Sequence, residues 1–422
     1  MKIVVVTGTR PDIIKMAPVY WEAKKRGHET VLVHAAQHYP YHLFEGSYRD
    51  MDLPFPPHYT VHSSLVKKIG VKTSKLAHAI DQKFSGARVY SKIESIASKV
   101  SEARPSPAKT LASIVAGMNK LFAGPLRDSD IVLVHGDTLT CAGAALSAHL
   151  SLLPVGHVEA GLRTFSREPF PEQTCTRAAD ACSDLHFAAT KLNERNLLNE
   201  GFSKDRIFTV GNTVVDAAWW AARKGERSRE FFEKLGINFS EPFIYFSCHR
   251  RETLLHEERF RAIAGAAMEI GRKGIQVLWS VRPGTFHALR QYGLLEKLGG
   301  SENVFLASDI PFYTDIMFFT SKCLFVATDS GSMQEETAAL KVPCVTLRYV
   351  TDRPESVDAG VNLLAPPASV GQIMAKVDLV LKNNSLMRCK PNPYGQGNSR
   401  KKILDTVEKF EGKLISWEHS KK

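Results

Sequence analysis

An acidic residue follows an apolar run in the stretch IVLVHGDTLT, residues 131 to 140. The run Ile131 to Val134 is typical of a buried strand in a parallel sheet. Ligands of open α/β sheets bind beyond the carboxyl ends of the strands, so Asp137 is placed to face a substrate. A carboxylate in that place can exchange a proton with a bound molecule. The alternative is that Asp137 only caps the helix begun by Thr138.

Basic and small residues follow other apolar runs. Arg10 and Lys15 flank the start of the first expected helix, where the N–H groups and the helix dipole favour an anion. His249 follows the apolar run FIYFS at another expected strand end. Taken alone, Arg10 and Lys15 are more typical of surface charges, and His249 with the arginines after it is compatible with a basic turn. Three residues that follow a strand and open a helix offer N–H donors to phosphate oxygens: Ser330, Gly331 and Ser332.

Alternating strands and helices must position these residues. The first series of expected strands covers 3–6, 31–34, 131–135, 155–158, 185–188 and 207–210, and the second covers 243–247, 275–280, 304–307, 324–327 and 344–347. This alternation predicts an α/β fold of two Rossmann-like doubly wound domains facing a cleft. We place them at 1–210 and 211–397, with a C-terminal helix at about 398–415 packing back on the first. Neither series contains a GxGxxG after a strand, which argues against a nicotinamide dinucleotide.

Composition limits the protein class. The 422 residues, 44% hydrophobic and 23% charged, suffice for two domain cores. No apolar run approaches the roughly 18 residues of a membrane span, and the first residues reach Arg10 and Asp12 too soon for a signal peptide. The seven cysteines form no CxxC pair, so we expect reduced, mostly buried thiols rather than zinc or disulfides. These features predict a cytoplasmic protein that does not associate with a membrane.

The formal charge of +11 is concentrated in one segment. Residues 61 to 109 hold ten basic and three acidic side chains. Phe84 and Tyr90 are the aromatic residues available there for base stacking, so a solvated helical insertion at about 61–105 is preferred over a nucleic-acid site. We therefore expect no nucleic-acid partner, and a structural role or an oligomer contact for this insertion.

Ten motifs together resemble the non-hydrolysing UDP-N-acetylglucosamine 2-epimerases. They occur in the family's order over nearly the whole chain, and 61 to 105 is the part that lies outside them. The motifs are GTRPDIIKMAP (8–18), AQH (36–38), HGDT (135–138), HVEAGLRT (157–164), PEQ (171–173), GNTVVD (211–216), HRRE (249–252), TDSGSMQEE (328–336), TDRPE (351–355) and NPYGQG (392–397). The resemblance implies the GT-B-like arrangement of two Rossmann-like domains around a sugar nucleotide.

The resemblance also implies a reaction. Deprotonation at C2 is costly because no carbonyl adjoins that carbon, and the family eliminates UDP from C1, then returns a proton and UDP to the glycal. Such a reaction needs proton-transfer groups on two sides of the sugar and cations or N–H donors for the diphosphate. It needs no metal and no cofactor. The catalytic set carried over is Asp137, Glu159, Glu172 and His249, with the acid and base roles left open.

The remaining carried-over residues bind the UDP-sugar. Glu336 resembles the family's ribose contact, and Tyr313 and Ile316 fall where the family packs its uracil. The allosteric nucleotide site of the family lies near AQH and Arg250. The full expected binding set is Arg10, Lys15, Gln37, His38, Arg250, Tyr313, Ile316, Ser330, Gly331, Ser332, Glu336 and Arg353.

Four positions depart from the family's pattern. The family's arginine four residues after the first glutamate of PEE is replaced by Thr176, with Arg177 one residue later. Ser332 stands where the family has glycine, Arg282 where it often has histidine, and Gln396 where it has aspartate.

Three functions are compatible with these residues. The first is a reversible, homodimeric epimerase that makes UDP-N-acetylmannosamine for surface polysaccharide. The second is a hydrolysing relative that releases N-acetylmannosamine and UDP when water traps the intermediate. The third is a GT-B glycosyltransferase or a non-catalytic sugar-nucleotide sensor. Retention of all four proton-transfer candidates disfavours the sensor, and the epimerase motifs disfavour the transferase.

Overall fold

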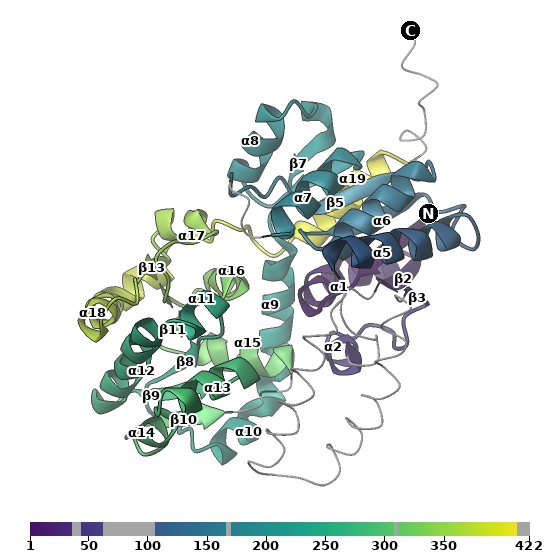
Figure 1. The fold of residues 1–422 in the computed structure, drawn as a ribbon. Coiled ribbons are helices and arrows are strands. Elements are labelled where there is room, and N and C mark those ends of the chain that lie inside the picture. The colour runs from purple at the N-terminus through teal and green to yellow at the C-terminus, as the bar shows by residue number, and fades with distance from the viewer. Residues whose placement is uncertain (36–43, 62–105, 166–169, 308–309, 311, 412–422) are drawn as a thin grey trace. The chain divides into compact units, whose positions relative to one another are not determined.

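The computed structural model describes residues 1–35, 44–61, 106–165, 170–307, 310 and 312–411. Contacts divide the chain into two units, Met1–Ala217 with Gly397–Lys422, and Ala218–Gln396 (Figure 1). Helix α9 (Thr213–Lys224) contains the point where the first unit ends and the second begins. Gln37, His38 and nearly all of the basic insertion lie outside the described residues.

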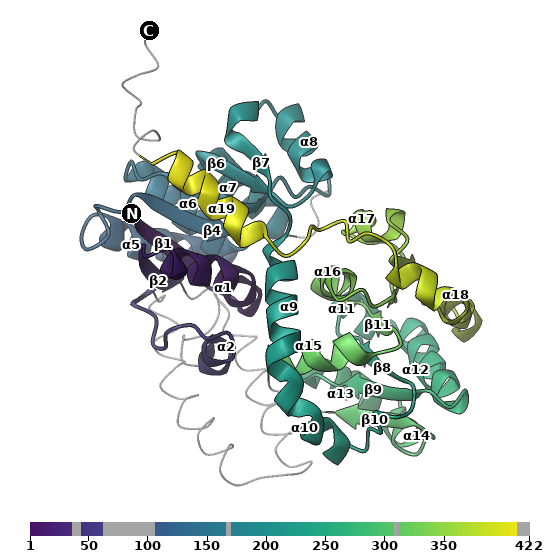
Figure 2. The ribbon, with the colours of Figure 1, turned by 180° about the vertical axis from the view of Figure 1, so that it is seen from behind.

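The first unit contains a parallel sheet in the order β3-β2-β1-β4-β5-β6-β7. Its strands are β1 (Lys2–Thr7), β2 (Glu29–Ala35), β3 (Tyr59–Val61), β4 (Ile131–His135), β5 (Val155–Ala160), β6 (Leu185–Ala188) and β7 (Ile207–Thr209). Its helices are α1 (Arg10–Lys25), α2 (Glu45–Asp50), α5 (Pro107–Phe122), α6 (Leu139–Leu150), α7 (Glu172–Ala181), α8 (Lys191–Asn199) and α19 (Ser399–Lys409), with a 3₁₀ turn at Lys204–Arg206. Helices α5 and α6 cover one face of this sheet, and α1 and α19 the other (Figures 1 and 2).

The second unit repeats this winding with the order β10-β9-β8-β11-β12-β13, again parallel. The strands are β8 (Phe243–Ser247), β9 (Gln276–Ser280), β10 (Val304–Ala307), β11 (Val326–Thr328), β12 (Cys344–Thr346) and β13 (Asn362–Leu364). The helices are α10 (Arg229–Lys234), α11 (Arg251–Leu254), α12 (Glu257–Arg272), α13 (Pro283–Gln291), α14 (Leu295–Gly299), α15 (Tyr313–Lys322), α16 (Gly331–Ala339), α17 (Pro354–Asp358) and α18 (Val370–Arg388), with a 3₁₀ turn at Gly225–Ser228. Helices α12 and α18 share a buried cluster with the sheet around Trp279.

These sheets confirm the predicted fold class. Every strand expected from the apolar runs is present, although β11 begins at Val326 rather than at residue 324. The sequence reading missed β3 and β13, which are edge strands of three residues each and are too short to show a pattern. In both sheets the strand order reverses beside the first strand, next to β4 in one and β11 in the other. Ligands of such folds bind at these switch points.

The helices begin where the sequence provides caps. Thr9 and Asp12 form a capping box at the start of α1, with Thr9 N–H donating to Asp12 Oδ2 at 3.0 Å. The turn before them needs a glycine, because a Cβ on Gly8 would lie 2.5 Å from the Ala35 carbonyl oxygen. At the other end of the chain, α19 lies against α1 and Arg400 forms an ion pair with Asp216 at 2.6 Å.

The cysteines fit the composition. All seven are free thiols, and Cys141, Cys175, Cys248, Cys323 and Cys344 are buried. The structure thus confirms that the chain has no disulfide framework. None of the helices described in the structure combines the length and apolar character needed to cross a bilayer.

The tight turn after β5 generates a stability prediction. Gly161 has φ +81°, and a Cβ there would lie 2.4 Å from the Asn193 carbonyl oxygen. Gly201, in the same unit, has φ +91° but no described atom within 4 Å of the same added carbon. We expect Gly161→Ala to lower the free energy of unfolding by about 3 kcal/mol and Gly201→Ala by about 1 kcal/mol. Urea denaturation of both variants measures the difference, and equal losses would show that the collision is relieved by a small backbone shift.

Candidate active site

Asp137 lies at the switch point of the first sheet, two residues after β4 ends. The residue before it, Gly136, has φ +72°, which turns the chain away from the strand. The N-cap of α6 is Thr138, whose Oγ1 accepts from Cys141 N–H at 3.1 Å. Helix capping therefore does not require Asp137, and the side chain is half-buried at the carboxyl edge of the sheet.

Glu159 is the penultimate residue of the neighbouring strand β5 and has an unusual backbone conformation. Its φ is +66°, and the pairing of β5 with β6 shifts register between Val158 and Ala160. A positive φ at a non-glycine residue costs on the order of 1–3 kcal/mol and is typical of functional sites. The buried carboxylate accepts from Lys15 Nζ at 2.5 Å and from Asn212 Nδ2 at 2.6 Å. These contacts fix the direction of the carboxylate.

His135 joins this carboxylate to a second one. Its Nδ1 lies 3.0 Å from Asp12 Oδ1, and its Nε2 lies 3.2 Å from Glu159 Oε2. Burial opposes a charged imidazole, but the Glu159 and Asp12 carboxylates outweigh burial and raise the pKa of His135 to about 9. With His135 and Lys15 both cationic, their charges balance those of the two buried carboxylates. We call these four residues and Asn212 the Glu159 cluster.

Glu172 is the first residue of α7. Burial raises the pKa of the Cys175 thiol to about 12, and the negative charges of Asp137 and Glu172 add to the effect. Both carboxylates therefore lie close to this one side chain. Glu172 Oε2 is buried without a hydrogen-bond partner among the residues that the structure describes. An oxygen of this kind can accept a hydrogen bond from a substrate hydroxyl or take up a proton.

The expected anion-binding residues of the first unit have different surroundings. Arg10 is half-buried at the first position of α1, as predicted. Lys15 is buried against Glu159, so its charge is already used in an ion pair. Its assignment to a diphosphate stays a prediction. The assignment of Gln37 and His38 to UDP-sugar binding also stays a prediction, because the structure does not describe these two residues.

His249 lies at the switch point of the second sheet. Its backbone N–H donates to Asp329 Oδ2 at 2.9 Å, and the Arg250 N–H donates to the same atom at 2.8 Å. The His249 Nδ1 lies 3.4 Å from Asp329 Oδ1. Burial, then Arg282 and Arg250, lower the pKa of His249 to about 4 against the opposing charge of Asp329. The imidazole is therefore neutral at pH 7 and is a weaker base than an ordinary histidine.

The start of α16 carries the predicted phosphate donors. Ser330 is its N-cap, and Gly331 and Ser332 are its first two residues. Gly331 leaves space beside a cation, because a Cβ there would lie 3.3 Å from Arg250 Nη2. The open N–H groups, the helix dipole and the arginine make this end of α16 favourable for an anion.

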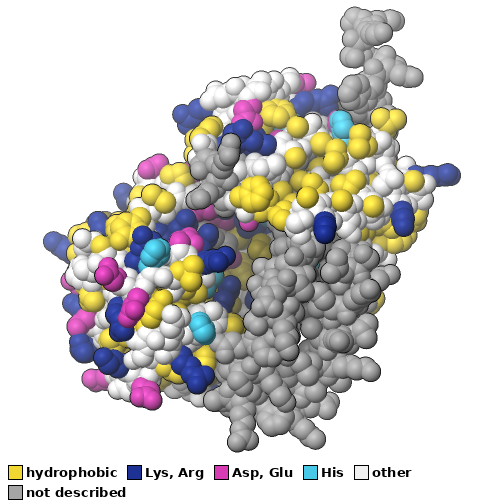
Figure 3. All heavy atoms as spheres, in the orientation of Figure 1, with side chains coloured by type: hydrophobic (Ala, Val, Ile, Leu, Met, Phe, Trp, Pro, Cys, Tyr) yellow, Lys and Arg dark blue, Asp and Glu magenta, His cyan; other side chains and the backbone are white. Residues whose placement is uncertain are grey.

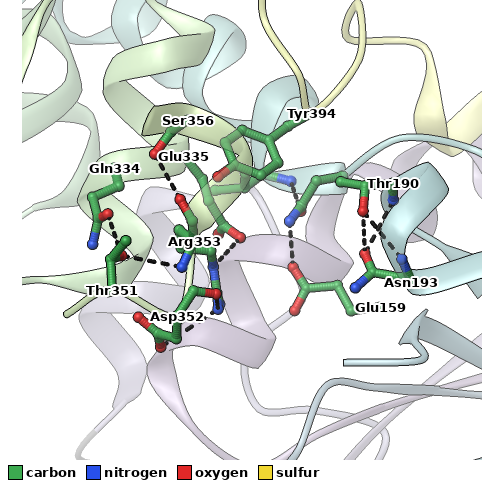
Figure 4. Close-up of polar contacts among 12 residues, drawn as sticks. Glu159, Thr190, Asn193, Gln334, Glu335, Thr351, Asp352, Arg353, Ser356 and Tyr394 are labelled. Carbon is green, nitrogen blue, oxygen red and sulfur yellow. Dashed lines mark hydrogen bonds and ion pairs between the residues drawn. The ribbon is translucent and has the colours of Figure 1, made fainter. Parts of the chain in front are cut away.

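Arg353 lies next to α16 within the second unit. Its Nε donates to Glu335 Oε1 at 2.6 Å, as Figure 4 shows. Glu336, the expected ribose contact, is buried on the same helix. The expected uracil contacts lie on α15, where Tyr313 is buried and Ile316 half-buried.

The position that departs most from the family's pattern is inside the first unit. Thr176 is fully buried, and its hydroxyl has no hydrogen-bond partner in the described part of the chain. Arg177 is 53% exposed and lies 3.7 Å from Glu200. The guanidinium one residue later therefore forms an ion pair on the surface.

Sequence reasoning missed the residues that hold these groups. Asp12, Asn212, Asp329 and Glu335 all lie inside the motifs, yet only spatial proximity reveals their roles. His135 lies in the HGDT motif, and the carboxylates that favour its charged form also become visible only in the structure. Among the described residues no group of three or more His, Cys, Asp or Glu side chains is arranged to hold a metal ion.

Comparisons with known proteins point in one direction. A family model described as UDP-N-acetylglucosamine 2-epimerase matches residues 80–408. The UDP-N-acetylglucosamine 2-epimerase of Methanocaldococcus jannaschii is 30% identical over 408 residues, which cover 96% of this chain and 98% of that protein. The M. jannaschii enzyme in complex with UDP-GlcNAc and UDP superposes with TM-score 0.74 and 29% identity, covering 97% of this chain and 100% of that one. For the Neisseria meningitidis enzyme bound to UDP-GlcNAc the values are 0.76, 26%, 97% and 100%.

The Glu159 cluster generates a pH prediction. Because folding raises the pKa of His135, its charge stabilises the protein fully below pH 6.5, and this contribution is lost as pH rises through about 9. We expect His135→Gln to reduce the dependence of the unfolding free energy on pH between 6 and 9 by about 2 kcal/mol. Urea denaturation at pH 6 and at pH 9 measures the change in unfolding free energy, with His256→Gln at an exposed position as the control. A wild-type-like pH dependence in His135→Gln would mean that the imidazole is neutral when folded.

Proposed function

This chain belongs to the UDP-N-acetylglucosamine 2-epimerase family, and from that premise we propose that it interconverts UDP-N-acetylglucosamine and UDP-N-acetylmannosamine by the non-hydrolysing route. The observation that carries the proposal is the set of carboxylates at the carboxyl edge of the first sheet. The charges of Asp137 and Glu172 both raise the pKa of the Cys175 thiol, and Glu159, the penultimate residue of β5, has a φ of +66°. The comparison structures with UDP-GlcNAc support this substrate.

The proposed reaction proceeds by elimination and re-addition. The C1–oxygen bond to UDP breaks as a base removes the C2 proton, and a glycal forms. A proton then returns to the opposite face of C2 as UDP adds back to C1. Inversion therefore needs two proton-transfer groups on different sides of the sugar ring.

Three side chains are suited to proton transfer in this proposal. Asp137 lies just after the end of β4, where Thr138 is the N-cap of α6, and Glu172 has a buried oxygen with no hydrogen-bond partner among the described residues. His249 is neutral near pH 7 because its pKa is lowered to about 4. We assign Glu159 to holding charge and hydrogen bonds near the reacting carbons, because protonating it would disrupt its ion pair with Lys15.

Within the second unit, the diphosphate is assigned to Arg353 and the start of α16. In the first unit, Arg10 stays a predicted phosphate contact. Backbone N–H groups and guanidinium groups stabilise the charge that develops as UDP departs. They also keep UDP beside the glycal after the bond breaks. This retention favours re-addition over capture of the sugar by water, and it is our reason for proposing the non-hydrolysing outcome.

Assembly and cellular role complete the proposal. Hydrophobic side chains gather on the surface over α5 and α6 (Figure 3), where Leu150 and Leu152 are 69% and 73% exposed. Such a surface suits a homodimer contact.

We place the enzyme in the cytoplasm, in accord with its free thiols. We propose that its product is a precursor for surface polysaccharide.

A proton NMR time course with UDP-N-acetylglucosamine tests the proposed function. Appearance of UDP-N-acetylmannosamine up to an equilibrium mixture is expected. Release of N-acetylmannosamine with stoichiometric UDP would instead identify a hydrolysing enzyme. An unchanged substrate spectrum would favour a transferase or a sensor.

Running the reaction in deuterium oxide tests the elimination step. Since the proposed acid and base groups exchange protons with solvent, deuterium is expected at C2 of both epimers at equilibrium. Mass spectrometry and the loss of the C2 proton signal measure its incorporation. Retention of the original hydrogen through many turnovers would contradict the mechanism.

Replacing one carboxylate tests its assigned role. Asp137→Asn keeps the side-chain size and removes the basic oxygen, so kcat is expected to fall by about 10² or more. UDP affinity, measured on the same protein by calorimetry, should stay near that of the wild type. The exposed Asp128→Asn, which alters an ion pair with Lys2, serves as the matched control. Near-normal turnover would remove Asp137 from the mechanism, and lost UDP binding would make it a nucleotide contact.

A further inference from the structure

The Asp352 carboxylate lies beside the start of α16, where the proposed diphosphate site needs positive charge. Asp352 Oδ1 accepts from Arg348 Nη1 at 2.8 Å, and its Oδ2 lies 3.5 Å from Arg353 Nη1. A Cβ on Gly331 would lie 3.5 Å from the same Oδ2 and 3.3 Å from Arg250 Nη2. Three guanidinium groups and the first turn of α16 therefore surround one carboxylate.

Asp352 is ionised throughout the physiological pH range. Burial alone would raise the pKa of this carboxyl group, but Arg353, Arg348 and Arg250 hold its pKa well below the usual range. Its side chain is 25% exposed, so the carboxylate lies near the surface of the arginine cluster. An anionic ligand at the start of α16 would meet this negative charge.

The loop that carries Asp352 is held by other contacts. Gln334 Oε1 accepts from Thr351 Oγ1 at 2.7 Å, and Thr351 Oγ1 accepts from the Arg353 N–H at 3.1 Å. Ser356 Oγ donates to the Arg353 carbonyl oxygen at 2.9 Å (Figure 4). Glu335 also binds the Arg353 Nε, and the Asp352 backbone carbonyl oxygen accepts from the Arg353 Nη1 at 3.1 Å. Neither contact uses the Asp352 carboxylate, so this arginine keeps these contacts when that charge is removed.

We propose that Asp352 is an internal counter-ion of the diphosphate site, which competes with bound diphosphate for the arginines and thereby weakens the binding of UDP. This inference rests on the proposed function, since it takes the start of α16 as the diphosphate site. A carboxylate near a ligand of two or more negative charges repels it, and it also attracts the cations that the ligand needs. Weaker binding allows the nucleotide-sugar product to leave after re-addition.

The competing role for Asp352 is to orient Arg348 and Arg353 for the ligand. The two roles predict opposite signs when the charge is removed. Loss of a counter-ion frees positive charge and tightens binding, whereas loss of an orienting group lets the arginines move and loosens binding.

Calorimetric titration of Asp352→Asn with UDP, and separately with inorganic pyrophosphate, tests the proposal. The amide keeps the size of the side chain and removes its charge. UDP Kd is expected to fall by about ten-fold at low salt, and the gain should shrink at high salt because ions screen the interaction. Asp378→Asn is the control, because Asp378 pairs with exposed Lys273 in the same unit at 3.0 Å, and its Kd should not change. An unchanged or larger Kd for Asp352→Asn overturns the proposal.

Two further measurements separate the possible failures. Asp352→Glu restores the charge, so it should return Kd toward the wild-type value, and Asp352→Ser replaces the amide if Asp352→Asn fails to fold. If the wild-type chain neither binds UDP nor epimerises the sugar, the proposed function fails. If the wild type does both and the charge-removing variants bind UDP no more tightly, only the counter-ion inference fails.

Discussion

Burial of the Glu159 carboxylate is the constraint on which the first unit depends. A buried charge is costly unless cations and hydrogen-bond donors surround it, and Glu159 gains them from Lys15, His135 and Asn212. Asp12 then balances the second cation. These residues come from α1, the end of β4, the end of β5 and the segment after β7. The cluster therefore links the strand ends around the switch point, and losing one member would leave an uncompensated charge.

The second unit solves the same problem with backbone groups. The fully buried Asp329 carboxylate, directly after β11, accepts from the N–H groups of His249 and Arg250 after β8. Backbone N–H groups therefore do for Asp329 what the buried Lys15 does for Glu159. In the first unit a cation is consumed in fixing the carboxylate. This difference is consistent with assigning sugar chemistry to the first unit and most of the nucleotide binding to the second.

The fold could be predicted from the sequence more completely than the contacts within the site could. Apolar runs bounded by polar residues define buried parallel strands, so the winding of both units could be predicted, whereas the three-residue edge strands β3 and β13 carry no pattern. Strand ends also predicted where Asp137 and His249 would lie. The pairing of Asp12 with His135 could not be predicted, because the two residues are 123 positions apart. Asp12 is in α1, which follows β1, and it meets His135 only when β1 and β4 pair in the sheet. The burial of Lys15 against Glu159 has the same origin.

The contacts of Asp137, Glu159 and Glu172 suggest different roles for these three carboxylates of the first unit. A carboxylate held by a buried ammonium and an amide gains little by taking a proton, because protonation breaks those contacts. Glu159 is in this position. Glu172 has a buried oxygen with no hydrogen-bond partner among the described residues. Asp137 follows β4 at the edge of the sheet, and its charge, like that of Glu172, raises the pKa of the Cys175 thiol. In the proposed reaction, proton transfer is therefore assigned to Asp137 and Glu172, and Glu159 is assigned the role of a fixed negative charge.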